Sequence, residues 1–485
     1  MLLASRPRPN KNMHLASWTA MVGAIMFGLD QGNFGNVQTF PGFREAWCQG
    51  RYGNEVTCGS HPDRGAGKNA SWQRSFLMWS TSLIAIGAAF GGLTVGPVVA
   101  RRFGRRPCIS VGASICCLGC VVVAFLTFGR VPVFMVGRFV TGFGVGVCCF
   151  TLTMYNAEIA TPDARGFISG LFQLNVVVGG LVATAVTWAY ENWRLGIMLP
   201  GVAGAVVAST VWLLPESPRY IMQKRKYEAG RAALQRLRYG DCSEEATQIF
   251  DHLAESDFGE VTYREIFTNP SLRQRTFIAC YLQVSQQLSG VNAFLGYASS
   301  LLDDAGFHNS KLLNTLWNVV FCVGTVAGLA LIDSRMGRRG ELLVATICMG
   351  PTLVIAGVAV MLNWRTLTEV MLCIYGLSFQ FGWGTVPWIY PAEIFSMAER
   401  EKAVSFVMLS QFGVNSIVYI VTPYLTPRSM AQTLVLAGVL KVVNIYFIRT
   451  CIKETRGLPL EAIPALFTSA RTNRLVQAAI AITGQ

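Results

Sequence analysis

Long apolar stretches alternate with short charged ones along most of this chain. Twelve of these stretches come close to the 20 or so residues that an α-helix needs to cross about 30 Å of hydrocarbon. The pattern therefore predicts an all-α membrane protein with twelve transmembrane helices. The first six expected spans are 17–37, 75–99, 107–128, 132–154, 166–188 and 196–214, and the second six are 275–301, 313–333, 341–362, 368–390, 403–424 and 431–450.

Motifs of the first half recur in the second. Tyr-x-Ala-Glu-Ile-x5-Arg occurs at 155–165 and again 235 positions later at 390–400, and Gly-Arg-Arg occurs at 104–106 and 337–339. Each copy stands where an apolar stretch ends in charge, so a block of helices with its loops was duplicated. We expect two parallel-repeat six-helix halves, 17–214 and 275–450, joined by a linker at 215–274, with tails at 1–16 and 451–485.

Composition and charge agree with a membrane protein. Of the 485 residues, 52% are hydrophobic and only 14% are charged, which excludes a soluble multidomain protein. The net charge of +13 comes largely from short loops on one side, with basic residues at Arg101, Arg102, Arg105, Arg106, Lys224, Arg225, Lys226, Arg335, Arg338 and Arg339. This is the positive-inside pattern, so we expect these loops and both termini in the cytoplasm, and no nucleic-acid partner.

The loop over 38–74 is expected outside the cell. It contains Cys48 and Cys58, for which a disulfide bond and two free thiols are both open. It also contains Asn69-Ala-Ser71, an acceptor pattern for N-glycosylation that also arises by chance.

The linker is the only polar interval of any length. Lys224 to Arg238 has the pattern of an amphipathic helix, with apolar residues such as Leu234 and Leu237 among Lys and Arg. We expect it to act as a cytoplasmic latch between the halves, and the alternative is a solvated connection.

Three ionisable residues stand inside the expected spans: Asp30, Arg138 and Lys441. A charge in a span costs about 2.5 to 3.5 kcal/mol on insertion scales, so each one is a functional candidate. At 1.5 Å per residue, Asp30 and Arg138 both lie about 10 Å below the outer surface, so they could pair. Protonation of Asp30 would loosen such a pair, and the alternative is a permanent salt bridge that only holds the helices together. Lys441 has no acidic partner in its own half, and we expect it to snorkel or to make a polar contact.

Several further motifs carry a family resemblance. They are Gly137-Arg138, Glu158 to Arg165-Gly166, Pro215-Glu-Ser-Pro-Arg219-Tyr220, Gln286-Gln287-Leu288-Ser289-Gly290-Val291-Asn292, Gly384-x-x-Pro387-Trp388 with Glu393 and Arg400, and Glu454-Thr-Arg-Gly457. Together they resemble the sugar porter family of the major facilitator superfamily, of the fungal monosaccharide transporter type. The match extends over nearly the whole chain.

The resemblance implies sites, residue by residue. It assigns the sugar to Phe27, Gln173, Gln286, Gln287, Asn292, Gly384, Trp388 and Gln411, and proton coupling to Asp30 and Arg138. It assigns gating salt bridges at the cytoplasmic side to Arg102, Glu158, Arg165, Glu216, Arg219, Arg335, Glu393, Arg400 and Glu454. Carboxamides suit a sugar because one side chain both donates and accepts hydrogen bonds. Gln283 and Asn415 could equally join helices to one another.

The chain also departs from the family pattern. Arg101 and Ser334 stand where the family has acidic residues, and Asp333 is displaced by one place. Thr153 and Lys453 replace prolines. Gly180 occupies a site position where relatives have glutamine or an aliphatic residue, which would shift substrate preference.

The function that we predict is a plasma-membrane hexose transporter, working by proton symport and alternating access in the lipid bilayer, with no cofactor and no metal. The alternatives are a facilitative uniporter, a carrier for a polyol or a quinate-type acid, and a sugar sensor that does not transport. Family sensors have long cytoplasmic tails, whereas about 35 residues follow the last span here. An enzyme is disfavoured because the four histidines are scattered over tails and loops.

Overall fold

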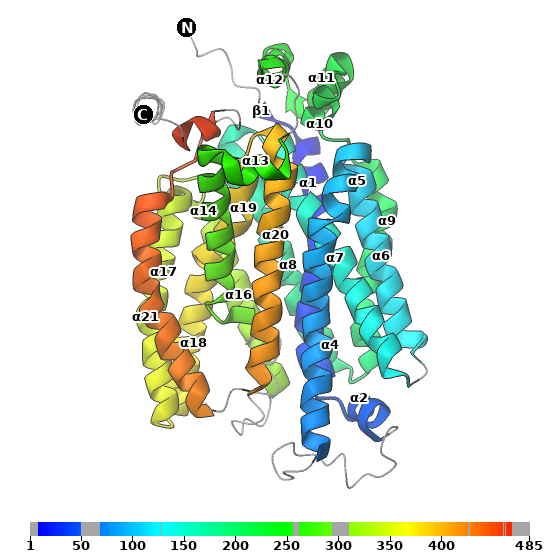
Figure 1. Ribbon diagram of the computed structural model, residues 1–485, viewed down its shortest axis with the longest axis vertical. Helices are drawn as coiled ribbons and strands as arrows, with labels where there is room; N and C mark the ends of the chain where they lie inside the picture. Colours follow the sequence, from blue (N-terminus) through cyan, green and yellow to red (C-terminus); the bar gives the residue numbers. More distant parts are fainter. Residues whose placement is uncertain are drawn as a thin grey trace.

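The computed structural model describes residues 8–49, 68–127, 129–255, 261–292, 310–424, 427–458, 460 and 462–467 (Figure 1). Nearly all of this part is helical, and nine of its helices are long and apolar enough to cross a membrane. The other three expected spans are 17–37, 275–301 and 368–390. The first lies within α1, a helix that begins at Pro270 covers the start of the second, and the third corresponds to a helix that is interrupted near Trp383.

The first half comprises six long helical segments. They are α1 (Lys11–Val37), α4 (Lys68–Leu93) continued by α5 (Val95–Phe103), α6 (Arg105–Phe125), α7 (Val131–Ile159), α8 (Arg165–Ala189) and α9 (Trp193–Thr210). The short elements of this half are α2 (Pro41–Arg44), the π-helix η1 (Glu45–Gln49) and the 3-10 turns η3 (Pro162–Ala164) and η4 (Val211–Leu213).

The second half repeats this order. Its long helices are α14 (Pro270–Gln287), α16 (Ser310–Leu331), α17 (Gly337–Met361), α18 (Arg365–Ser378), α20 (Met397–Val421) and α21 (Pro427–Cys451). After α18, a π-helical turn η5 (Phe379–Trp383) and α19 (Val386–Ile394) complete one interrupted span, while η6 (Thr422–Tyr424) and η7 (Ile463–Phe467) are single turns. Pro387 and two glycines account for the interruption, because proline cannot donate a helix hydrogen bond.

Close helix packing brings the central elements together. A Cβ atom on Gly28 of α1 would lie 1.9 Å from the carbonyl oxygen of Val176 in α8, and one on Gly32 would lie 2.6 Å from that of Gly180. Only glycine permits this approach. Between the halves, α8 packs against α16 and α4 against α20, and the last pair stands side by side in the middle of Figure 1.

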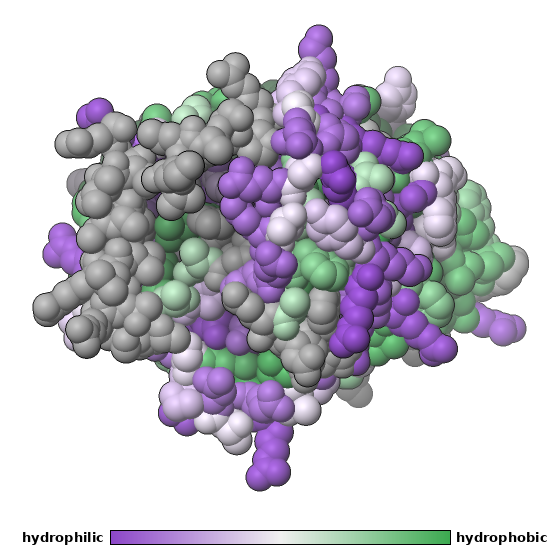
Figure 2. Space-filling model, turned by 90° about the horizontal axis from the view of Figure 1, so that it is seen from above, coloured by the Kyte–Doolittle hydropathy of each residue, from purple (hydrophilic) through white to green (hydrophobic). Residues whose placement is uncertain are grey.

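The linker forms a small helical cap at one end of the bundle. It contains α10 (Pro218–Gln223), α11 (Tyr227–Gln235), α12 (Ser243–Glu255) and α13 (Tyr263–Thr268). The amphipathic helix expected at 224–238 is shorter, because it ends at Gln235 and the chain becomes strand β2 (Arg238–Tyr239), which pairs antiparallel with β1 (Arg8–Pro9). Figure 2 shows polar residues gathered over this end and apolar residues at its rim.

The cap contacts both halves. Met222, Leu234 and Ile249 pack in one apolar cluster with Met397 at the start of α20. Its Arg238 donates to the carbonyl oxygen of Ile159, where α7 ends, at 3.0 Å. These contacts fit the latch that the sequence predicted.

Candidate functional site

The repeated Gly-Arg-Arg and Glu motifs form one network at the capped end of the first half. Arg105, the first residue of α6, lies 2.8 Å from Glu158 in a buried ion pair. The carboxylate of Glu216 accepts hydrogen bonds from the backbone N–H groups of Arg105 and Arg106 at 3.1 and 3.2 Å. These two N–H groups at the start of α6 have no partner within the helix, so Glu216 caps it. Gly104 has a φ of 107°, and a Cβ atom there would lie 2.4 Å from Glu216.

The second half builds the same network from the second copies. Arg338 pairs with Glu393 at 2.8 Å, and Glu454 accepts from the backbone N–H groups of Arg338 and Arg339 at 3.2 and 3.1 Å. Asp333, although displaced by one place, also lies 2.8 Å from Arg338. The sequence repeats thus correspond to duplicated contacts, and the displacement does not remove this pair.

Charged side chains also join the two halves at this end. Arg105 lies 2.8 Å from Glu401, and Arg400 lies 3.6 Å from Glu158. Asp333 accepts hydrogen bonds from two backbone N–H groups at the start of α8. The capped ends of the halves are therefore in contact in this structure.

Not every residue expected in the gate forms an ion pair. Arg102 and Arg335 are exposed, and neither forms an ion pair with any residue in the described ranges. The chain turns at Gly104 and Gly337, two residues after these arginines. Arg105 and Arg338, which follow the turns, are the arginines directed inward. Glu216 and Glu454 bind backbone N–H groups rather than arginine side chains.

Two further gate candidates are buried arginines. Arg165 donates to the carbonyl oxygen of Leu458, in the tail that follows the second half, at 2.8 Å. Burial, together with the nearby charges of Arg165 and Arg400, lowers the pKa of Arg219 to about 9. Arg219 therefore stays protonated at neutral pH, and three positive charges are crowded between the halves.

Neutral amide side chains meet in the interior of the second half. Gln286 donates to the carbonyl oxygen of Trp383 at 2.6 Å and accepts from Gln411 at 3.0 Å. Gln287 donates to Gln286 at 3.4 Å and accepts from Asn292. All of these carboxamides are buried. The structure thus brings together four of the predicted sugar ligands.

Two buried acceptors on α20 have no donor among the described residues. They are Oε1 of Gln411 and Oδ1 of Asn415, which are four residues apart and share a face of the helix. Buried acceptors are normally satisfied, so these atoms can accept from a ligand. Oε1 of Gln283 also lacks a donor there, but its amide group donates to the carbonyl oxygen of Pro387 at 2.8 Å and joins α14 to α19.

Aromatic rings lie beside the amides. Trp388 contacts Phe27, Phe172 and Phe412, with ring centroids 6.4, 4.7 and 6.3 Å away. Phe27 also meets Phe412 edge to face at 5.7 Å. Since Phe27 and Phe172 belong to the first half, the rings bridge the two halves next to the carboxamides.

Gln380 is a polar residue of this region that the sequence motifs did not single out. Its Oε1 accepts from Gln173 at 3.1 Å and from Thr325 at 3.3 Å, so it links the two halves. A Cβ atom on Gly384 would lie 2.1 Å from that oxygen. Its position inside a predicted span, like that of the other glutamines, was a signal that could have identified it.

The glycine that departs from the family pattern faces the opposite half. A Cβ atom on Gly180 would lie 2.8 Å from Oδ1 of Asn318 in α16. Asn318 is buried and donates to the carbonyl oxygen of Asn314 at 2.9 Å. The second half therefore supplies a polar group directly opposite Gly180.

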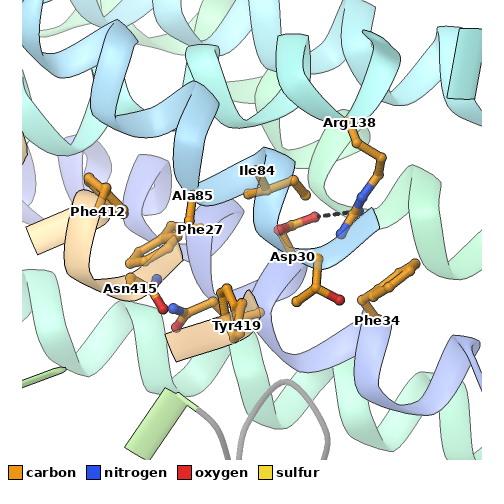
Figure 3. A pocket seen from close by; sticks show the side chains of 11 residues that line it. Phe27, Asp30, Phe34, Ile84, Ala85, Arg138, Phe412, Asn415 and Tyr419 are labelled. Carbon is orange, nitrogen blue, oxygen red and sulfur yellow. Dashed lines mark hydrogen bonds and ion pairs between the residues drawn. The ribbon is translucent and has the colours of Figure 1, made fainter. Parts of the chain in front are cut away.

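Asp30 and Arg138 form a buried pair at 3.1 Å. Arg138 has two other partners, since it donates to the carbonyl oxygen of Ser80 at 2.8 Å and its guanidinium lies 4.2 Å from the centroid of the Phe34 ring. Figure 3 shows the pair at one side of a cavity whose other side is formed by Phe27 and Phe412. Asn415 lines the same cavity.

Some predicted residues cannot be placed. Cys58 lies outside the described residues, and the side chains of Cys48 and Asn69 are likewise not described. The disulfide bond and the glycosylation site stay predictions.

Lys441 is buried in α21.

A family model described as Sugar (and other) transporter matches residues 16–467 of this chain. The chain belongs to this family. It is therefore a multi-pass membrane protein of the sugar transporter family.

Individual relatives differ in what they do. The chain is 27% identical to the H(+)/hexose cotransporter 2 of Parachlorella kessleri, over 94% of this chain and 87% of that protein. It is 26% identical to the High glucose sensor RGT2 of Saccharomyces cerevisiae, over 97% of this chain but 63% of the sensor. The structure of the proton:xylose symporter XylE bound to 6-bromo-6-deoxy-D-glucose superposes with a TM-score of 0.83 at 22% identity, covering 95% of this chain and all of that one. This likeness establishes the major facilitator fold of two six-helix halves.

Proposed function

We propose that this protein is a hexose:proton symporter that works by alternating access. One observation carries the proposal: a single cavity is lined by the Asp30–Arg138 pair and also by Phe27, Phe412 and Asn415. The latter residues adjoin the carboxamides that a sugar would bind. Occupancy by sugar and protonation of Asp30 can therefore influence each other through this cavity.

The remaining site assignments follow from this proposal. Gln173, Gln286, Gln287, Asn292 and Gln411 bind the hydroxyl groups of the sugar, with Trp388 and Phe27 against its ring. Gly384 keeps the broken helix close to the ligand. The ion pairs between the halves close the cytoplasmic side, and the sugar enters from outside.

Location belongs to the proposal as well. The positive-inside pattern of the basic loops supports a cytoplasmic cap and cytoplasmic termini, and uptake of hexose requires the plasma membrane. A facilitative carrier, a carrier for polyols or quinate-type acids and a sensor remain rivals. The sensor is favoured specifically by the glucose sensor among the relatives.

Uptake of radiolabelled sugars in yeast lacking its own hexose transporters tests the proposal. We expect concentrative uptake of at least one hexose, abolished by a protonophore. Uptake that equilibrates and ignores the protonophore would indicate a uniporter. No uptake from a panel of hexoses, polyols and quinate, despite normal surface protein, would favour the sensor.

A further inference from the structure

A buried cation in the second half has no part in the mechanism proposed above. Lys441 lies on α21, and only 3% of its surface is exposed, so the side chain does not snorkel. Its ammonium group donates to Oγ of Ser289 and lies 5.3 Å from the centroid of the Trp383 ring. It forms no ion pair with any residue in the described ranges. An ionisable side chain retained at such a place is expected to have a function.

The surroundings of the ammonium group explain how the charge is tolerated. The hydroxyl of Ser289 donates to the carbonyl oxygen of Ser285 at 2.8 Å, so its oxygen is available to accept from Lys441. Ser289 lies just beyond the last residue of α14, where the helix carries a partial negative charge of about half an electron. The face of an indole ring also attracts a cation. The helix end and the indole ring thus stabilise the ammonium group in place of a carboxylate.

Both partners of Lys441 belong to interrupted helices that carry proposed sugar ligands. Ser289 lies just beyond Gln286 and Gln287, the last two residues of α14. Trp383 ends η5, and its carbonyl oxygen accepts from Gln286. Tyr375 of α18 donates to the carbonyl oxygen of Ser289 at 2.7 Å. Lys441 therefore contacts both the end of α14 and η5, the two elements that carry proposed sugar ligands.

The face of α21 that carries Lys441 also forms other hydrogen bonds with α14. Asn444 accepts hydrogen bonds from Tyr281 at 2.8 Å and from Ser285 at 3.4 Å. With Ser289, these residues are spaced by four along one face of α14 and its continuation. At the offset of the internal repeat, the first half has only Ala, Gly and Val over 203–208. The contact is thus confined to the half that carries most of the carboxamides.

We propose that Lys441 is a positioning residue of the sugar site. Its hydrogen bond to Ser289 and its contact with the Trp383 ring hold the end of α14 against η5 and thereby set the orientation of Gln286 and Gln287. This inference rests on the proposed function, because it assigns the effect of Lys441 to the affinity for sugar.

The test compares influx kinetics of four variants of the full chain, each normalised to surface protein. They are Lys441→Met, Ser289→Ala, the double variant and the control Val442→Met, whose residue is 67% exposed on the same helix. We expect Lys441→Met and Ser289→Ala each to raise the half-saturating sugar concentration about 10-fold, as for one lost hydrogen bond to a charged group, with little change in maximal rate. The double variant should be no weaker than the weaker single variant, because both remove one contact.

The outcomes separate this inference from the proposed function. If the wild type takes up no sugar, the proposed function fails. If the wild type transports and Lys441→Met keeps its affinity, or if the two substitutions are additive, the positioning role fails. If Lys441→Met does not reach the surface, Ser289→Ala decides alone, since it leaves the charge in place.

A second measurement involves no sugar. The variant Gln287→Cys is treated with a small charged thiosulfonate added outside the cell, with Lys441 or Lys441→Met in the same chain. We expect the modification rate to change about 3-fold or more when the ammonium group is lost. Equal rates would contradict the proposal even if no substrate is known.

Discussion

At the scale of single residues, the candidate site is defined by which buried polar groups already join helices. The amide of Gln283 is held by a backbone carbonyl of α19, whereas Gln411 and Asn415 each direct an acceptor without a donor among the described residues. A sugar hydroxyl can supply that donor. The buried carboxamides therefore fall into two groups: those that join one helix to another, and those that we propose bind the sugar.

Gln287→Ala tests the ligands. A buried partner left unpaired costs about 1 to 3 kcal/mol, so the apparent affinity for sugar should fall roughly 5-fold to 150-fold at normal surface expression. Gln283→Ala, one turn earlier on α14, is the control and should lower the amount of folded protein more than the affinity. Unchanged uptake kinetics in Gln287→Ala would remove this residue from the site.

Asp30→Asn tests the proton switch. The amide imitates the protonated carboxyl and loosens the pair with Arg138, so accumulation against a gradient should be abolished while sugar exchange survives. Arg138 keeps Ser80 and Phe34 as partners, which should preserve folding. Uptake is measured across external pH and normalised to surface protein. Accumulation with an unchanged pH dependence would leave the uniporter as the better explanation, and loss of surface protein would indicate a structural bridge.

At the scale of elements, the interrupted span α18–η5–α19 positions the largest number of site contacts. Its backbone accepts from Gln286, its Gln380 reaches the first half, and its Trp388 carries the aromatic cluster. A regular helix could not present all three, because the break redirects the side chains that follow it.

Gly384→Ala tests this element. The added methyl group displaces Gln380, whose contact with Gln173 should be lost, and we expect the affinity for sugar to fall about 10-fold. Gly413→Ala is the matched control, since nothing lies within 4 Å of a Cβ atom there. It should transport normally, because alanine suits a helix better than glycine. Equal kinetics for the two variants would show that the break needs no glycine at 384.

At the scale of the whole molecule, the duplicated charge networks lie at the capped end, where the two halves are in contact, and we propose that they close that side. Each network is complete within its own half, and a smaller set of contacts, Arg105–Glu401 and Arg400–Glu158 among them, crosses between the halves. The halves can therefore separate without losing their internal structure.

Glu401→Gln weakens only a contact between the halves. We expect the equilibrium to shift about 10-fold toward the inward-facing state, because one charge-assisted hydrogen bond is lost. The half-saturating sugar concentration should rise when measured from outside and fall when measured in inside-out vesicles. Glu399→Gln removes a pair with Arg275 inside the second half and is the control. The same shift in both variants would contradict this assignment of the closing contacts.

The sequence by itself determined the number of spans and their duplication, and it predicts which side is cytoplasmic. These features depend on the length of apolar stretches and on the placement of charge, both of which are local properties of the chain. It also singled out Asp30, Arg138 and most of the carboxamides, since polar residues inside spans are conspicuous.

Only the tertiary structure decided which of these residues meet. Arg105 rather than Arg102 enters the gate because the chain turns at Gly104, and Gln380 reaches Gln173 only because the halves pack against each other. The helix expected at 224–238 ended early because β2 pairs with the distant β1. Lys441 found its partners at the end of another helix and on a ring. Such partners are separated by many residues in the chain, so their contact depends on packing, which a pattern of apolar and polar positions does not specify.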